Sequence, residues 1–199
     1  MSTEQAEARV LFSVVLGDAN VLFSRVLRDY ILYSMSHQLI RVRWSQQILD
    51  EMVEHLMTKV AGFDLSAAER LIEAMNAAFP YSQVALTADA SAVVAHLSLP
   101  DEDDRHVLAA AVAAGATFLC SDDRTGFPSD TMAILGMEWI TADALLSTLV
   151  QESPKTMLMV HRTAVSRMTG ATDESTLAAL RGANAVRTAD LMEALLKKS

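Results

Sequence analysis

The chain has 199 residues, of which 51% are hydrophobic and 21% charged, a composition that fits one globular domain with a small appendage and excludes a disordered chain. Its single cysteine, Cys120, excludes an internal disulfide framework and a multi-cysteine zinc site, and its apolar neighbours predict a buried thiol. Charged residues precede the first apolar stretch, which is the wrong order for a signal peptide, and no apolar run is long enough to span a membrane. We therefore expect a cytoplasmic protein without membrane association.

The net charge is −9, and it is unevenly distributed. Residues 151–199 carry seven Lys and Arg against five Asp and Glu, whereas residues 1–150 carry nine against twenty. Because phosphate affinity comes mainly from Lys and Arg, this balance argues against a simple RNA-binding module. It argues less against a nuclease, whose carboxylates are neutralised by bound cations.

The first half of the chain alternates apolar runs with amphipathic stretches. Residues 10–16 form a β-branched, apolar run that stops at a turn sequence, which is typical of a buried parallel strand. A helix over 21–36 and a second strand over 39–44 follow. Ser45 is a good N-cap for the next helix, and Asp64 opens another amphipathic helix that reaches about residue 80.

The second half continues this alternation and then becomes purely helical. Residues 88–98 form a short helical or irregular stretch. The acidic run from Asp101 opens a helix that ends at Gly115, because acidic residues favour a helix N-terminus and glycine favours a C-cap. The remaining elements are expected in this order: a strand over 116–121, a short strand over 136–140, a helix over 142–150, and three helices over 155–168, 173–182 and 187–198.

Strands that alternate with helices predict an α/β fold, with a parallel sheet of four or five strands covered by helices on both faces. The chain is expected to divide into a domain over 1–150 and a helical C-terminal extension over 151–199. The basic balance of the extension suggests a surface for a nucleic acid, a partner protein or a second subunit. An equally good interpretation is that the extension only covers an apolar face of the core.

Acidic side chains stand where two predicted strands end. Asp18 follows the first strand, and Asp122 and Asp123 follow the strand over 116–121. A further acidic run opens the helix before that strand, and Glu51 lies on the helix after Ser45. Open α/β sheets bind ligands at the carboxyl ends of their strands. If these acids converge, their mutual repulsion calls for a hard cation such as Mg²⁺ or Mn²⁺.

Taken singly, each acid has a structural interpretation. Asp18 could be an ordinary loop residue, and Asp101 and Asp103 are best read as helix-start residues. Asp50 and Glu54 belong to a solvated helix face. The five histidines form no metal-binding spacing and no phosphate-cradling glycine loop is present, which argues against a zinc enzyme and a nucleotide-binding fold.

Four short segments, taken in order, resemble the motifs of PIN domains. They are VVLGDANVL at 14–22, SQQILDE at 45–51, DEDDRHVLAAA at 101–111 and TFLCSDDRTGFP at 117–128. The order and spacing match over residues 10–145, about two-thirds of the chain. Each motif is weak alone, but four in order make a specific signal.

The resemblance implies that four carboxylates hold the metal: Asp18, Glu51, Asp104 and Asp123. Asn20 and Ser121 would be polar supports beside them. Asp122 is the alternative to Asp123, and Asp123 is preferred because the Phe-Pro pair at 127–128 aligns it with the family's last acid. The chain departs from many relatives at Gly126, where they carry an acid.

The resemblance further implies an Mg²⁺- or Mn²⁺-dependent endoribonuclease that hydrolyses a phosphodiester, with RNA as its substrate. Its biological role would be the toxin of a type II toxin–antitoxin pair, of the VapC kind, with an antitoxin protein as partner. A housekeeping RNA-processing nuclease and a non-catalytic protein-binding scaffold remain the alternatives. His106 could contact RNA near the site or pack its helix. The oligomeric state is open, with a homodimer among the options.

Overall fold

The computed structural model describes residues 10–198, which form two compact units. The sheet unit consists of residues 14–23 and 42–139. The helical unit consists of the described residues up to 13, residues 24–41 and residues 140–198. All the acids singled out by the sequence lie in the sheet unit.

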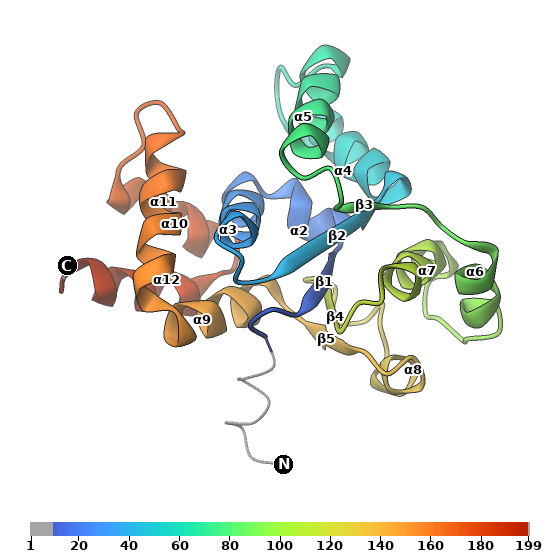
Figure 1. The fold of residues 1–199 in the computed structure, drawn as a ribbon. Helices are drawn as coiled ribbons and strands as arrows, with labels where there is room; N and C mark the ends of the chain where they lie inside the picture. The colour runs from blue at the N-terminus through green and yellow to red at the C-terminus, as the bar shows by residue number, and fades with distance from the viewer. Residues whose placement is uncertain (1–9, 199) are drawn as a thin grey trace. The chain divides into compact units, whose positions relative to one another are not determined.

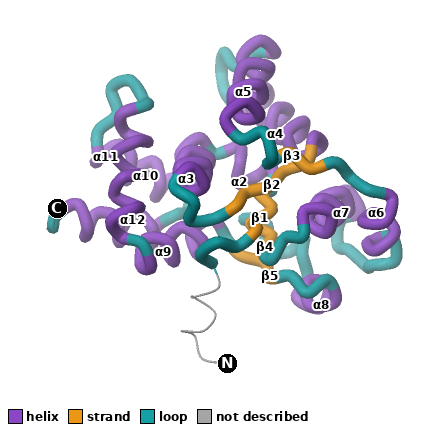
Figure 2. Tube along the Cα trace, viewed as in Figure 1, coloured by secondary structure: helices purple, strands orange, loops and turns teal. Residues whose placement is uncertain are grey.

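Five strands form one parallel sheet in the order β3-β2-β1-β4-β5, with helices around it (Figures 1 and 2). Their bounds are β1 Val14–Gly17, β2 Arg41–Ser45, β3 Gln83–Val84, β4 Phe118–Cys120 and β5 Glu138–Ile140. β1 and β4 pair in parallel, with Val15 opposite Phe118 and Gly17 opposite Cys120. The predicted α/β fold with a parallel sheet is therefore confirmed.

The three central strands β2, β1 and β4 are mostly buried because helices cover them, as the continuous apolar runs predict. Leu16, Trp44 and Leu119 have no exposed surface, and α7 packs against β1. Cys120 is also fully buried with a free thiol, so the expected structural cysteine is confirmed.

Several helices of the sheet unit begin or end at the residues that the sequence signals predict. Their bounds are α2 Ala19–Phe23, α4 Gln46–Lys59, α5 Leu65–Ala78, α6 Ala88–Val94, the 3₁₀ helix η1 Glu102–Asp104, α7 Arg105–Ala114 and α8 Ser129–Ile134. Ser45 accepts a hydrogen bond from the Ile48 amide, and Asp64 caps α5 in the same way. Gly115 ends α7 in the left-handed conformation, at φ 59°, which favours glycine.

The helical unit contains α3 Arg25–Ser36, α9 Ala142–Glu152, α10 Pro154–Ser166, α11 Asp173–Gly182 and α12 Val186–Leu196. α12 packs on α9 and on α11, and α10 packs on α3. Asp143 joins α9 to α12 by accepting hydrogen bonds from the amide and the hydroxyl of Thr188, at 2.8 and 2.7 Å. The buried ring of His161 bonds the Tyr30 hydroxyl on one side and lies 3.2 Å from Asp173 on the other. The expected C-terminal helices are therefore present.

Two local predictions need correction, and two short elements were not predicted. The strand predicted over 10–16 begins only at Val14, because the residues before it form a turn in which Phe12 has φ 65° and is 67% exposed. The helix predicted over 21–36 is two helices, because Ser24 is extended between them. The short elements β3 and α8 carried no recognised sequence signal.

None of the helices within residues 10–198 has the length and apolar character needed to cross a membrane. The division into 1–150 and 151–199 stays a prediction. In the structure, α3 belongs to the same compact unit as the C-terminal helices.

Candidate active site

The pairing of β1 with β4 brings two distant polar segments together at the carboxyl ends of the strands. Gly17 lies opposite Cys120, and the amide of Asp18 donates to the Cys120 carbonyl at 3.0 Å. The residues that directly follow the two strands, Asp18 and Ser121, therefore lie side by side. This is the edge where parallel sheets bind their ligands.

A network of hydrogen bonds fixes the Asp18 carboxylate. Its Oδ2 accepts from the Ser121 hydroxyl at 2.7 Å and from the Asn20 amide at 2.7 Å, and its Oδ1 accepts from the Ala19 amide at 2.7 Å. Asn20 also donates to Ser121 at 2.9 Å and accepts from the Asp122 amide at 3.1 Å. Asn20 and Ser121 thus lie against Asp18 as polar supports, as the sequence suggested.

Burial dominates the electrostatics of Asp18. The residue is only 6% exposed, and this burial raises the pKa of its carboxyl above the ordinary value. The hydrogen bonds from Ser121 and Ala19 act in the opposite direction by stabilising the charged form. The repulsion of Asp123 adds to the upward shift.

Asp104 and Asp123 converge on Gly126. A Cβ atom built on Gly126 would lie 2.6 Å from Asp104 Oδ2 and 2.8 Å from Asp123 Oδ2, closer than non-bonded atoms approach. Both carboxylate oxygens therefore adjoin the space that a side chain at position 126 would fill, and glycine leaves that space open.

Asp123 and Asp104 differ in how readily they ionise. Asp123 Oδ1 accepts from the amide and the hydroxyl of Thr125, at 2.8 and 2.9 Å, and from the Gly126 amide at 3.1 Å. These bonds, above all the one from the Thr125 amide, hold the pKa of Asp123 below its ordinary value. Burial and then the repulsion of Asp18 raise the pKa of Asp104 to about 6.

Glu51 lies beside His106, which belongs to α7. His106 Nε2 is 2.7 Å from Glu51 Oε1. Burial lowers the pKa of His106, so its ring is neutral near pH 7, and its Nδ1 is buried without a partner among residues 10–198. His106 Nε2 and Glu51 Oε1 therefore share one hydrogen bond that joins α7 to α4. Burial, followed by the repulsion of Asp18 and Asp104, raises the pKa of Glu51 to about 7.

The four acids implied by the resemblance form one electrostatically coupled group. Asp18 repels Glu51, Asp104 and Asp123, and Asp104 repels Glu51 and Asp123 as well. Within residues 10–198, none of the four forms an ion pair with Lys or Arg. Close carboxylates without a basic partner leave a negative charge that a cation would neutralise.

The donor set fits Mg²⁺ or Mn²⁺ in its chemistry, because these hard cations prefer carboxylate oxygens. The side chains are not arranged as a finished metal site: no group of three His, Cys, Asp or Glu within residues 10–198 stands in metal-binding geometry. The carboxylates would therefore have to rotate toward a bound ion, and the attraction of the ion would have to outweigh their mutual repulsion.

The other candidates are placed as follows. Asp101 caps η1 by accepting from the Asp103 amide at 2.9 Å, so its helix-start interpretation is confirmed. The Asp122 amide is bonded to Asn20, and Asp122 adds to the rise in the pKa of the buried Cys120 thiol, which is caused mainly by burial. The preference for Asp123 over Asp122 as the metal-facing acid remains a prediction, and the position of Asp123 beside Asp104 supports it.

Sequence reasoning missed three features of this region. It considered His106 without its bond to Glu51, because a contact across 55 residues leaves no local signal. It noted Gly126 as a departure without seeing that two carboxylates surround it. It passed over Arg124, an exposed cation next to Asp123 that pairs with no side chain within residues 10–198.

Comparison with known proteins agrees with this arrangement. The family model described as "PIN domain" matches residues 14–125, which include the ends of β1 and β4 and every acid discussed above. Neither the curated proteins nor the solved structures contain a match to the chain. Since the match covers more than half of the 199 residues and its motifs lie at the sheet edge where the acids meet, the chain belongs to the PIN-domain family, whose activity is that of a nuclease.

Proposed function

We propose that this protein is an Mg²⁺- or Mn²⁺-dependent endoribonuclease whose metal ligands are Asp18, Glu51, Asp104 and Asp123. The observation that carries the proposal is the gathering of carboxylates at the carboxyl ends of β1 and β4, where Asp18 bonds Ser121 and where Asp104 and Asp123 both adjoin Gly126. A group of like charges held together by the fold destabilises the metal-free protein, so its retention is best explained by a ligand that neutralises it.

A bound Mg²⁺ or Mn²⁺ would supply Lewis-acid chemistry for hydrolysis of a phosphodiester. The protein's own residues position it. Asp18 is held by Ser121 and Asn20, so its carboxylate has one fixed orientation. His106 orients Glu51 through the hydrogen bond at its Nε2, and the Thr125 and Gly126 amides orient Asp123.

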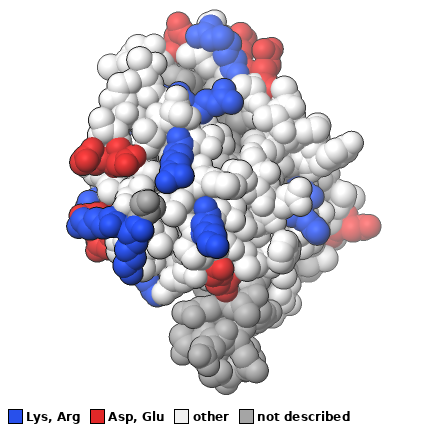
Figure 3. Space-filling model, turned by 60° about the vertical axis from the view of Figure 1, so that its left-hand side comes forward, with Lys and Arg blue, Asp and Glu red and all other residues white. Residues whose placement is uncertain are grey.

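The net charge of the sheet unit is unfavourable for RNA binding, because the unit carries sixteen Asp and Glu against five Lys and Arg. Arg124 is the basic side chain best placed to meet a phosphate, since it is exposed and adjoins Asp123. The described part of the helical unit carries ten Lys and Arg against seven Asp and Glu. On the face drawn in Figure 3, Lys and Arg spread over the surface, which supports a contribution of such side chains to RNA binding.

We further propose that the protein is a cytoplasmic toxin of the VapC kind, held inactive by an antitoxin protein, and that it can form a homodimer. The helices over 151–199 would be the extension that receives RNA or a partner. A housekeeping RNA-processing nuclease is the alternative role. Expression should arrest growth and a neighbouring gene product should relieve the arrest; expression without any effect on growth would favour the housekeeping role. The non-catalytic scaffold is less favoured, since that role does not need four coupled acids.

Cleavage of unpaired RNA tests the proposal. Purified protein should generate new RNA ends with Mn²⁺ or Mg²⁺, and EDTA should stop the reaction. Cleavage that continues in EDTA, or none at any metal concentration by well-folded protein, would contradict a metal-dependent nuclease.

A further inference from the structure

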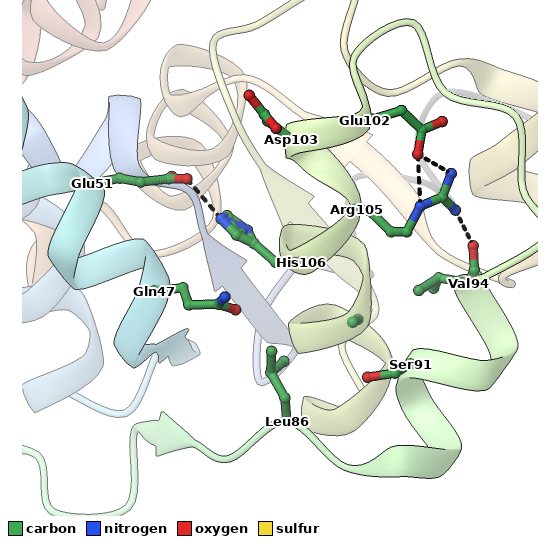
Figure 4. Close-up of a pocket in the computed structure, with 10 residues that line it drawn as sticks. Gln47, Glu51, Leu86, Ser91, Val94, Glu102, Asp103, Arg105 and His106 are labelled. Atoms are coloured by element: carbon green, nitrogen blue, oxygen red, sulfur yellow. Dashed lines mark hydrogen bonds and ion pairs between the residues drawn. The ribbon is translucent and has the colours of Figure 1, made fainter.

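A cleft of about 510 Å³ opens beside the Glu51–His106 pair (Figure 4). It is formed by α4, the segment before α6, α6 itself, η1 and α7. Its size is within the range of small-molecule sites and exceeds that of one nucleobase. Because Glu51 is both a wall of the cleft and a member of the acidic set, an occupant of the cleft would adjoin the site of cleavage.

Arg105 braces one wall of the cleft with four of its five N–H donors. Its guanidinium donates to Glu102 through Nε at 3.0 Å and NH2 at 2.6 Å, to the Leu97 carbonyl at 3.0 Å and to the Val94 carbonyl. These bonds tie the start of α7 to α6 and the residues after it, so the wall is rigid. The cleft therefore offers no free cation to a phosphate.

Three polar side chains around the cleft are free to bind a ligand. Gln47 on α4, Ser91 on α6 and Asp103 on η1 make no side-chain hydrogen bond within residues 10–198, and Figure 4 shows Gln47 and Ser91 on opposite sides of Leu86. Leu86, Val94 and Ala109 supply apolar surface between them. A planar ligand with hydrogen-bonding groups along one edge fits this arrangement of apolar and polar side chains.

The charge of the cleft selects the kind of polar edge. Glu51, Glu102 and Asp103 line it, and Arg105 is the one Lys or Arg among the lining residues. Such a lining repels a phosphate and favours N–H donors. Guanine presents N1–H and N2–H side by side, which a single carboxylate such as Asp103 can accept together. Uracil presents one N–H between two carbonyls and fits poorly.

We propose that this cleft is a subsite for one unpaired nucleobase next to the scissile phosphate, with a preference for bases rich in N–H donors, guanine first. The proposal rests on the proposed nuclease function, and it names the part of the RNA that the protein reads. Recognition of unpaired bases through their hydrogen-bonding edges is the usual route to sequence preference in RNA.

Nucleoside binding tests the subsite without relying on catalysis. Guanosine and uridine are titrated into metal-free protein and followed by NMR chemical shifts, for the wild type, Ser91→Trp, Gln47→Ala and Val93→Trp. Ser91→Trp fills the cleft, whereas Val93→Trp adds the same bulk to α6 at a position that is 54% exposed and not part of the lining. Guanosine should bind the wild type and Val93→Trp about tenfold more tightly than uridine, the discrimination expected of one bidentate base contact. Ser91→Trp should abolish binding and Gln47→Ala should weaken it.

The same four proteins are then compared on a random unpaired RNA pool with Mn²⁺, and the cut ends are sequenced. A base preference at one position beside the cut that Ser91→Trp removes and Val93→Trp keeps supports the subsite. Guanosine binding by a protein that cuts no RNA would overturn the nuclease function and leave the subsite standing. Normal cutting with a preference unchanged in Ser91→Trp, or equal binding of both nucleosides by all four proteins, would overturn the subsite alone.

Discussion

Replacing Gly126 with alanine should disable the metal site without removing any charge. The new methyl group would lie 2.6 Å from Asp104 Oδ2 and 2.8 Å from Asp123 Oδ2. Since ordinary contacts are longer, each carboxylate must move by roughly half an ångström or more. The methyl group would adjoin both carboxylates and hinder their joint rotation toward an ion, so Gly126→Ala should lose most of its affinity for Mg²⁺ or Mn²⁺.

The loss can be read from thermal unfolding. An ion at about 100 times its Kd stabilises the folded state by about 2.7 kcal/mol. For a chain of this length, that corresponds to a rise in Tm of about 5–10 °C. The wild type should show this rise with Mn²⁺, and Gly126→Ala should show less than about 2 °C.

Gly182→Ala is the matched control, because a Cβ at that helical glycine meets nothing within 4 Å. It should respond to Mn²⁺ as the wild type does. An equal rise in Tm for Gly126→Ala and the wild type would show that Asp104 and Asp123 do not share an ion, and would refute the reasoning.

Three further predictions concern the charges of the site. Metal-free Asp104→Asn should be at least as stable as the wild type in urea unfolding, because one repelling charge is gone; a clear loss of stability would mean that Asp104 has a favourable partner instead. In the folded state the pKa values of Glu51, about 7, and Asp104, about 6, exceed their ordinary values of 4.5 and 3.8, so the folded state binds more protons than the unfolded state. The free energy of unfolding of the metal-free protein should therefore fall as the pH rises from about 4 to 7. A rise of that free energy over the same pH range would contradict the pKa shifts. Arg124→Ala should weaken the binding of all unpaired RNAs alike, and the slope of log K against log salt concentration, measured by fluorescence titration, should fall in magnitude by about one. An unchanged slope would exclude a contact between Arg124 and a phosphate.

Much of the fold follows from local signals in the sequence. The buried strands are continuous apolar runs, and Ser45 and Gly115 act at helix ends through interactions with residues a few positions away. β3 escaped detection because its two residues are too few to show a period, and it exists through pairing with β2. The turn at Phe12 looked like strand because its apolar residues continue the pattern of β1.

The sequence predicted the part of the site that follows from the order of the strands in the sheet. Acids after parallel strands meet at one sheet edge, so the position of Asp18 beside Ser121 was foreseeable. The bond between Glu51 and His106 depends on how α4 and α7 pack, which no local pattern encodes. The role of Gly126 was hidden for the same reason, because the space it leaves is defined by a carboxylate from η1.

The most direct test of the central claim compares RNA cleavage by the wild type, Asp104→Asn and Asp64→Asn at equal concentration with Mn²⁺. Asp64 caps α5, outside the coupled acids, and asparagine can keep that cap. Cleavage by Asp64→Asn should match the wild type, and cleavage by Asp104→Asn should fall to the level of a protein-free control while its circular dichroism spectrum stays native. Wild-type cleavage rates for a clean preparation of Asp104→Asn would contradict the assignment of these acids as the catalytic metal site.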